Sequence, residues 1–233
     1  FVGGGTPSVL NEKQFDRFFG AIHSNFKFEP GYEFTFEANP GSLDYNKLKA
    51  LKEYGVNRLS IGVQAFQDEL LERIGRNHQE NDIYEIIELA RQTGFNNISI
   101  DLMFGLPGQT LSMFKESLEK AKKLPIDHVS AYSLQIEPKT IFYNQMNAGT
   151  LHLPPEEEET AMFEELIKQM RDNGFIHYEI SNFAKPGKES KHNLTYWDNN
   201  EYYGIGAGAH SYIDGVRREN AGPLKKYMSL VNE

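Results

Sequence analysis

The sequence FVGGGTPSVL, Phe1–Leu10, decides how the rest of the chain is organised. Two apolar residues typical of a strand, Phe1 and Val2, run directly into three consecutive glycines. Glycines at the carboxyl end of a strand let backbone N–H groups turn toward a ligand, and the ligand can approach closely because no Cβ intervenes. We therefore expect a buried strand followed by a ligand-binding loop. Because the chain begins inside this strand and without methionine, we also expect it to be a segment of a longer protein.

The composition narrows the class of protein. A chain of 233 residues suits one α/β domain better than two small ones. The formal net charge of -9 argues against broad nucleic-acid binding and favours a small-molecule ligand. Cysteine is absent, which excludes disulfides, a cysteine nucleophile and thiolate metal sites within this segment. The sequence shows neither a bilayer-spanning apolar run nor a signal peptide, so we expect a cytoplasmic protein without stable membrane insertion.

Strand-like and helical segments alternate over the first two-thirds of the chain, as in βα units around a parallel sheet. Polar residues or glycines follow every predicted strand, whereas a doubly wound open sheet concentrates them at one switch point. This favours a partial (β/α) barrel with its site at the carboxyl ends of the strands. The further predicted strands are Glu33–Ala38, Arg58–Gln64, Asn97–Phe104 and His128–Leu134. The predicted helices are Asn11–Phe26, a helix capped by Ser42, Asp68–Arg76, Asn81–Thr93 and a helix capped by Thr110.

The pattern changes beyond Pro138. A long helix is predicted from Glu156 to Asn173, and its acidic first turn complements the helix dipole. The segments after it are rich in aromatic residues, and we predict that they are extended. The predicted extended segments are Tyr178–Phe183, Asn193–Trp197 and Tyr202–Asp214, and a weak helical pattern begins at Pro223. The expected divisions are 1–150 for the barrel, 151–222 for a barrel-closing helix and aromatic-rich extension, and 223–233 for the start of a truncated C-terminal region.

Three polar side chains end different predicted strands beside the glycine loop. They are Glu37, Gln64 and Asp101, and together they could hold an amine and the hydroxyls of a ribose. Taken singly, a glycine run is more often a tight turn, and an aspartate after a strand more often caps the next helix. The joint arrangement favours a ligand site, because the functional groups of parallel barrels come from the ends of several strands.

Five separated motifs carry a family resemblance: FVGGGTPS, FEANPGSL, RLSIGVQAF, RIGRNH and NISIDLMFGLPGQT. Together they resemble the radical SAM proteins of the oxygen-independent coproporphyrinogen III oxidase family. The resemblance implies a partial (β/α)6 TIM-like barrel, S-adenosylmethionine as ligand and a [4Fe-4S] cluster held by a CxxxCxxC loop. Because this chain contains no cysteine, we expect that the first strand and the cluster loop are missing from it and that it holds strands 2 to 6.

The resemblance also implies roles for individual residues. Glu37 would accept hydrogen bonds from the methionyl ammonium, Arg76 would pair with the methionyl carboxylate, and Asp101 or Gln64 would bind ribose hydroxyls. On sequence grounds, a solvated arginine at a helix end is an equally good interpretation of Arg76. The residues that match S-adenosylmethionine contacts in the family are Gly4, Gly5, Thr6, Glu37, Gln64, Arg76 and Asp101, with Ala131 and His210 flanking the cofactor.

A second motif is HNLTYW, His192–Trp197. It resembles the HNxxYW signature of the haem-chaperone branch of this family, the HemW branch. The resemblance implies that His192, Asn193, Tyr196 and Trp197 bind haem, with the imidazole of His192 as a candidate axial ligand of the iron. The structural alternative is an aromatic-rich edge strand in which the histidine is only hydrogen-bonded. The following GIGAGAHS, Gly204–Ser211, suits close approach of the backbone to a cofactor.

Three functions follow from these features. The leading prediction is a haem-binding chaperone with a radical SAM core, whose partners are haem and a haem-accepting protein. The rival enzyme is an oxygen-independent coproporphyrinogen III oxidase, which decarboxylates propionates by radical chemistry. A third hypothesis is a cofactor-independent barrel that binds a phosphorylated small molecule. The sequence carries no signal for an oligomeric state.

Overall fold

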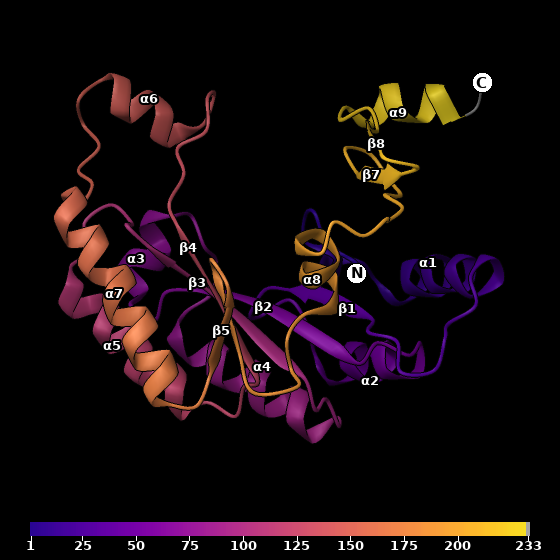
Figure 1. Cartoon of the computed structure of the whole chain (residues 1–233), viewed down its shortest axis with the longest axis horizontal. Helices are drawn as coiled ribbons and strands as arrows, with labels where there is room; N and C mark the ends of the chain where they lie inside the picture. Colours follow the sequence, from indigo (N-terminus) through magenta and orange to yellow (C-terminus); the bar gives the residue numbers. More distant parts are fainter. Residues whose placement is uncertain (232–233) are drawn as a thin grey trace. The chain divides into compact units, whose positions relative to one another are not determined.

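The computed structural model describes residues 1–231, and the chain divides into two compact units (Figure 1). The first unit is Phe1–Glu189, and the second begins at Ser190. Helix α7, Glu156–Asp172, lies in the first unit because it packs against α5, Leu111–Lys123. Figure 1 shows these two helices side by side. The domain boundaries expected after residues 150 and 222 stay predictions.

The first unit is built on a six-stranded sheet with the order β1-β2-β3-β4-β6-β5. Neighbouring strands from β1 to β4 are parallel, while β6 pairs antiparallel with both β4 and β5. The sheet does not close within the part of the chain that the structure describes, which confirms a mixed α/β fold of the partial-barrel type. The strands are β1 Thr35–Ala38, β2 Arg58–Gln64, β3 Ile98–Phe104, β4 His128–Ser133, β5 Ile176–Glu179 and β6 Asn182–Ala184.

The opening residues extend this sheet by one bridge only. Val2 bridges Phe36 in parallel, with hydrogen bonds from the Val2 amide to Thr35 and from the Glu37 amide to Val2. The strand predicted at Phe1 and Val2 is therefore reduced to one bridge, because the glycines that follow turn the chain away from β1. The bridge still places the glycine loop beside the carboxyl end of β1.

The helices of the first unit fall near the predicted positions, except for α6, Ile141–Asn147, which the sequence analysis did not predict. Asn11 caps α1 by accepting from the amide of Gln14, and Thr110 caps α5 by accepting from the amide of Met113. The short 3-10 helix Pro7–Val9 precedes them. The helices before α7 are α1 Glu12–Asn25, α2 Tyr45–Glu53, α3 Asp68–Arg73, α4 Glu80–Gln92, α5 and α6 Ile141–Asn147.

The predicted cap of α2 is wrong. Asp44, not Ser42, accepts a hydrogen bond from the amide of Lys47 and starts this helix. The Ser42 hydroxyl instead bonds back to the backbone of Asn39, because the intervening Pro-Gly turn brings the two residues together. Ser42 thus stabilises the strand-to-helix turn beside β1.

Alternation along the strands separates the hydrophobic core from a polar face. In β2, Leu59, Ile61 and Val63 are fully buried, and they belong to one core with side chains of α1, α2, α4, α5 and α7. The alternate residues, Arg58 and Ser60 among them, point to the opposite face of the sheet because the side-chain period of a strand is two residues. The polar side chains at the carboxyl ends therefore share a face without interrupting the core.

The second unit corrects one sequence prediction. Asn193–Trp197 was expected to be extended, but it lies in helix α8, Lys191–Trp197. Ser190 caps this helix by accepting from the amide of Asn193, and this cap outweighs the aromatic content that favours a strand. The unit continues with β7 His210–Ile213, β8 Val216–Glu219 and α9 Leu224–Val231, so Tyr202–Asp214 is only partly extended and the expected helical tail is present.

No helix within residues 1–231 is both long enough and apolar enough to cross a bilayer.

An ion pair joins the end of α4 to the start of β4. The Arg91 guanidinium lies 2.7 Å from the Asp127 carboxylate, and it also donates to the carbonyl oxygens of Phe95 and Pro125. Asp127 in turn accepts a hydrogen bond from the amide of Ile98 at the start of β3. One carboxylate therefore ties together a helix and two strands.

We expect Asp127→Ala to lower the free energy of unfolding by about 2–3 kcal/mol, because the substitution leaves the buried amide of Ile98 without its acceptor and the Arg91 guanidinium without its charge partner. Urea denaturation of the purified chain measures the effect. Asp172→Ala is the matched control, since Asp172 pairs with Arg171 at the surface and an exposed pair contributes less than about 1 kcal/mol. Equal losses in the two variants would contradict the structural role of Asp127.

Candidate functional site

A cavity of about 310 Å³ lies where the glycine loop meets the carboxyl ends of β1 and β2 and the middle of β3. Its volume falls at the lower end of the range for small-molecule sites. The cavity brings together six residues predicted from the sequence and four others. The predicted residues are Gly5, Thr6, Glu37, Gln64, Arg76 and Asp101, and the others are Ala38, Asn39, Ser60 and Gly62.

The glycine loop fits closely over Glu37. The amide of Gly4 donates to Glu37 Oε2 at 3.1 Å. A Cβ at Gly3 would lie 2.5 Å from the same carboxylate, and Gly4 has a φ of +88°, which side chains disfavour. The glycines therefore serve two purposes: Gly3 leaves room for the carboxylate, and Gly4 turns an N–H toward it.

A bulge at the end of β2 directs Gln64 into the cavity. Gln64 has a φ of +66°, and the register with β3 shifts between Gly62 and Gln64. Such a bulge re-aims a side chain, and left-handed backbone at a residue other than glycine is concentrated at functional sites. A Cβ at Gly62 would lie 2.9 Å from both Asn39 Oδ1 and Gln64 Nε2. The absence of a side chain at Gly62 thus allows these two amides to face the cavity.

Arg76 is part of the cavity and not a solvated helix end. Its Nη1 donates to Asn39 Oδ1 at 2.9 Å. Burial lowers the pKa of the guanidinium, and the charge of Asp101 partly offsets that effect. Asn39 was not among the predicted site residues. The signal for it was its position directly after β1, at the start of the sequence Asn39-Pro40-Gly41 that ends the strand.

Both carboxylates of the cavity, Glu37 and Asp101, have raised pKa values. Burial raises the pKa of Asp101, while hydroxyls of Ser130 and Ser60 and the charges of Arg58 and Arg76 oppose the rise. Burial also raises the pKa of Glu37; the Gly4 amide opposes it, and the charge of Asp101 adds to it. Two carboxylates thus face one lining arginine, Arg76, so the cavity suits a ligand that brings positive charge.

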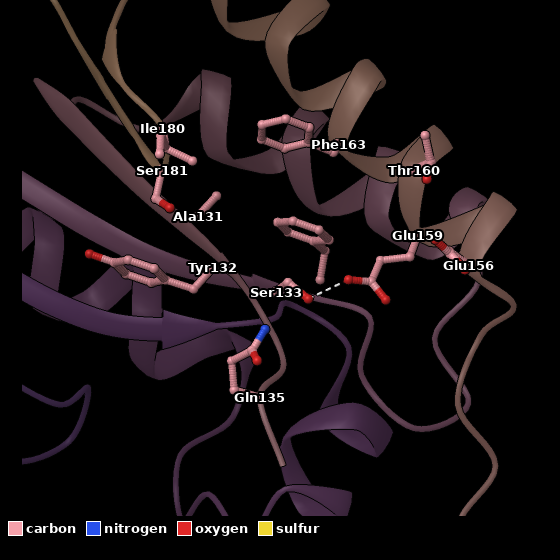
Figure 2. Close-up of a pocket in the computed structure, with 11 residues that line it drawn as sticks. Ala131, Tyr132, Ser133, Gln135, Glu156, Glu159, Thr160, Phe163, Ile180 and Ser181 are labelled. Atoms are coloured by element: carbon pink, nitrogen blue, oxygen red, sulfur yellow. Dashed lines mark hydrogen bonds between the residues drawn. The ribbon is translucent and has the colours of Figure 1, made fainter. Parts of the chain in front are cut away.

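A second cavity of about 580 Å³ lies between β4 and α7 (Figure 2). It contains Ala131, which was predicted to flank S-adenosylmethionine but does not line the smaller cavity. The Ser133 hydroxyl donates to Glu159 across it. No lysine, arginine or histidine is among its lining residues, so it is a poor site for a ligand with many carboxylates. Its walls include Phe104, Tyr132, Phe163 and Ile180 beside Glu156 and Glu159.

The acidic first turn of α7 therefore has more than one role. The sequence predicted that it complements the helix dipole. Glu158 also accepts a hydrogen bond from the amide of Leu111 at the start of α5, and Glu159 accepts the bond from Ser133. These contacts attach α7 to α5 and to the end of β4.

The remaining predicted residues lie in the second unit. On α8, the ring of His192 contacts that of Tyr196 with centroids 4.7 Å apart, as expected for residues one helical turn apart. Trp197 is 55% exposed. His210 lies on β7 with Nε2 4.0 Å from Glu219. Its role toward S-adenosylmethionine stays a prediction, as do the haem roles of His192, Asn193, Tyr196 and Trp197.

The GIGAGAHS segment makes a close approach within the chain itself. A Cβ at Gly204 would lie 1.9 Å from the carbonyl oxygen of His210. The Asn220 side chain donates to the carbonyls of Gly204 and Gly206 and holds this loop. Gly204 therefore serves a backbone-to-backbone contact.

The chain's own residues do not fit a [4Fe-4S] cluster. The cluster is bound by cysteine thiolates, and the sequence contains none. Residues 1–231 also contain no group of three or more His, Asp or Glu side chains arranged to hold a metal ion.

The raised pKa of Glu37 predicts a pH-dependent effect on stability. The folded state binds this proton more tightly than the unfolded state, so stability is lost as pH rises from the ordinary carboxyl pKa through the raised one. We expect Glu37→Gln to raise the Tm of the ligand-free chain at pH 7 by about 1–2 °C, and the gain to vanish below about pH 4.

Thermal melts over this pH range measure the effect. Glu53→Gln, an exposed carboxylate at the end of α2, controls for the change in net charge. A Glu37→Gln variant that is less stable than the parent at pH 7 would contradict the prediction.

Comparisons with known proteins agree with this architecture. The model of the radical SAM superfamily matches residues 1–121. The solved structure of "Coproporphyrinogen III oxidase (HemN)" from Escherichia coli superposes with a TM-score of 0.85 at 28% identity, covering 99% of this chain and 56% of that one. The fold is therefore HemN-like.

Curated relatives are more similar in sequence. The "Heme chaperone HemW" of Bacillus subtilis is 54% identical over 100% of this chain and 62% of the relative. That of Lactococcus lactis is 48% identical over 98% of this chain and 60% of the relative. The chain thus spans about three-fifths of the length of these relatives. With a superfamily match over more than half of its residues, the chain belongs to the radical SAM superfamily and is a HemW-like member of it.

Proposed function

We propose that this chain binds S-adenosylmethionine through its first unit and haem through its second, as part of a cytoplasmic haem chaperone of the HemW type. The observation that carries the first half is the strand-end cavity, where two carboxylates, one guanidinium and a glycine loop converge. S-adenosylmethionine has a sulfonium and an ammonium against one carboxylate, so its net charge is positive. The charge of the ligand thus complements the excess of carboxylates in the cavity.

Each lining residue has a role in this proposal. Glu37 accepts from the ammonium, Arg76 pairs with the carboxylate, and the amides of the glycine loop lie at the methionine end. Asp101 and Gln64 bind the ribose hydroxyls. In radical SAM proteins a reduced [4Fe-4S] cluster cleaves the bound cofactor to a 5′-deoxyadenosyl radical. This chain contributes cofactor binding only, because it has no thiolate for the cluster.

We expect Glu37→Ala and Asp101→Ala each to weaken binding of S-adenosylmethionine by about tenfold, the effect of losing one charged hydrogen bond. Equilibrium dialysis with the labelled cofactor measures the affinity. Glu53→Ala, which removes an exposed carboxylate, should bind like the parent chain. Unchanged affinity in both site variants would mean that the residue assignments are wrong.

The haem half of the proposal is supported by α8. Its His192 supplies an imidazole, a common axial ligand of haem iron, on a surface that also carries Tyr196 and an exposed Trp197. The two relatives named as haem chaperones are 54% and 48% identical in sequence to this chain. The proposal also includes a partner protein that accepts the haem from the chaperone.

Two features argue against the rival functions. Coproporphyrinogen III carries propionates, and the larger cavity beside the strand ends offers no cation to receive them. A phosphorylated ligand would meet two carboxylates and one arginine in the smaller cavity. Formation of protoporphyrinogen IX from coproporphyrinogen III by the cluster-loaded full-length protein would establish the oxidase instead.

We expect titration with haem to shift its Soret band, and His192→Ala to weaken that binding by at least about tenfold, because the iron loses its axial ligand. Absorbance spectroscopy measures both. His152→Ala removes an exposed histidine outside the motif and should leave the titration unchanged. Absence of any Soret shift with the parent chain would refute the haem assignment.

A further inference from the structure

His78 is a buried, ionisable residue that the proposed cofactor contacts do not use. It belongs to the RIGRNH motif and is only 5% exposed. It lies between α3 and α4, two residues after Arg76, which lines the strand-end cavity. Its imidazole Nε2 lies 3.2 Å from the carbonyl oxygen of Val63 in β2. One side chain thus connects the segment that carries Arg76 to the strand that ends in Gln64.

The Val63 carbonyl belongs to the bulge that directs Gln64 into the cavity. The register with β3 skips Val63, which is therefore the extra residue of the bulge. Its carbonyl oxygen accepts one hydrogen bond from the Ala65 amide at 2.9 Å and one from His78. These two donors fix the plane of the peptide bond between Val63 and Gln64. That plane sets the backbone of Gln64, whose φ of +66° is left-handed.

The bond from His78 requires a proton on Nε2, because a carbonyl oxygen only accepts. Burial lowers the pKa of His78, and the charge of Arg76 also lowers it, while the Val63 carbonyl, Asp82 and Asp68 oppose the shift. The imidazole is therefore neutral at pH 7 and carries a single proton. With that proton on Nε2, His78 is a donor that adds no positive charge beside Arg76.

Gln64 depends on this bond more than Arg76 does. Nη1 of Arg76 donates to Asn39 Oδ1 at 2.9 Å, and its backbone amide donates to the carbonyl of Leu71 at 2.9 Å. Arg76 is thus held from two other sides. Among the described residues, none hydrogen-bonds to the side-chain amide of Gln64, so the direction of that amide follows from its backbone.

We propose that His78 is a positioning residue for S-adenosylmethionine binding, which holds the bulge of β2 so that the amide of Gln64 faces the cofactor. The inference rests on the proposed function, in which Gln64 binds the ribose hydroxyls. His78 is not among the residues that line the cavity. It acts through the Val63 carbonyl and the backbone of Gln64, because residues behind the direct ligand contacts set the orientation of those contacts.

The first test removes the imidazole and then restores a donor. We expect His78→Leu to weaken binding of S-adenosylmethionine by about tenfold, because the Gln64 amide no longer holds its direction. His78→Gln places an amide N–H near the position of Nε2, and we expect its affinity to lie within about threefold of the parent chain. Equilibrium dialysis with the labelled cofactor measures both. Parent-like affinity of His78→Leu would overturn the proposal, as would a loss that His78→Gln does not reduce.

A double-mutant cycle tests whether His78 acts through Gln64. Glycine adopts left-handed backbone without strain, so Gln64→Gly removes the amide and keeps the bulge. We expect this variant to weaken binding by about tenfold, and the addition of His78→Leu to cost less than about twofold more. Independent tenfold losses at the two positions would overturn the proposal, since His78 would then act by another route.

His23→Leu is the matched control, because the His23 imidazole makes the same kind of bond away from the cavity. Its Nε2 lies 3.0 Å from the carbonyl oxygen of Tyr54, which precedes the start of β2. We expect this variant to bind the cofactor within about twofold of the parent. An equal loss in His23→Leu would overturn the proposal, because it would reflect a general loss of stability.

Far-UV circular dichroism of each variant shows whether the chain remains folded. If His78→Leu does not fold, His78→Asn takes its place, since the asparagine amide is one methylene shorter than that of glutamine and falls short of the Val63 carbonyl. If Glu37→Ala weakens binding while the His78 variants do not, the role of His78 is refuted and the cofactor function stands. If the parent chain does not bind S-adenosylmethionine, the cofactor function is refuted together with the role of His78.

Discussion

The arrangement of the first unit follows from bringing two carboxylates to one face of the sheet, Glu37 near the carboxyl end of β1 and Asp101 in the middle of β3. Partial burial of such groups costs free energy unless donors and cations surround them. The Gly4 amide, the Ser60 hydroxyl and Arg76 supply that surrounding. In both groups the pKa remains raised, so these donors only partly offset the cost. A cationic ligand would offset more of it.

The same requirement explains local features that otherwise seem unrelated. A side chain at Gly3 would collide with Glu37, and one at Gly62 would crowd Asn39 and Gln64. The left-handed backbone of Gln64 costs conformational energy, which the surrounding packed strands must offset. Alternation along the strands keeps these groups apart from the apolar face. The helices can therefore pack a continuous core while the opposite face carries polar chemistry.

The sequence predicted the parts of this design that follow from strand periodicity. It located the four parallel strands, β1 to β4, and identified Glu37, Gln64 and Asp101, because each is a polar residue within or at the end of a strand-like run. The sequence placed Asp101 at a strand end, but it lies in the middle of β3. The bulge at Gln64 and the contribution of Asn39 depend on the register between strands, which no local pattern encodes. Roles of individual residues toward a cofactor came from family resemblance and stay predictions.

The HNLTYW segment shows how a local pattern can mislead. Its aromatic content favoured a strand, but the cap from Ser190 and the one-turn spacing of His192 and Tyr196 suit a helix. The helix matters for the proposed function. In a strand, four residues of extended chain would separate the side chains of His192 and Tyr196, whereas one helical turn brings their rings into contact.

Charge is distributed unequally between the two units, and this bears on which ligand each can bind. The part of the sequence from Ser190 on contains five lysines and arginines and five acidic residues, so the net charge of -9 lies entirely on residues 1–189. An anionic ligand such as haem is repelled less by the second unit than by the first. A cationic ligand is favoured by the first unit, both by its overall charge and by the carboxylates of its cavity. The two proposed ligands, S-adenosylmethionine and haem, have opposite charges, and each is assigned to the unit whose charge suits it.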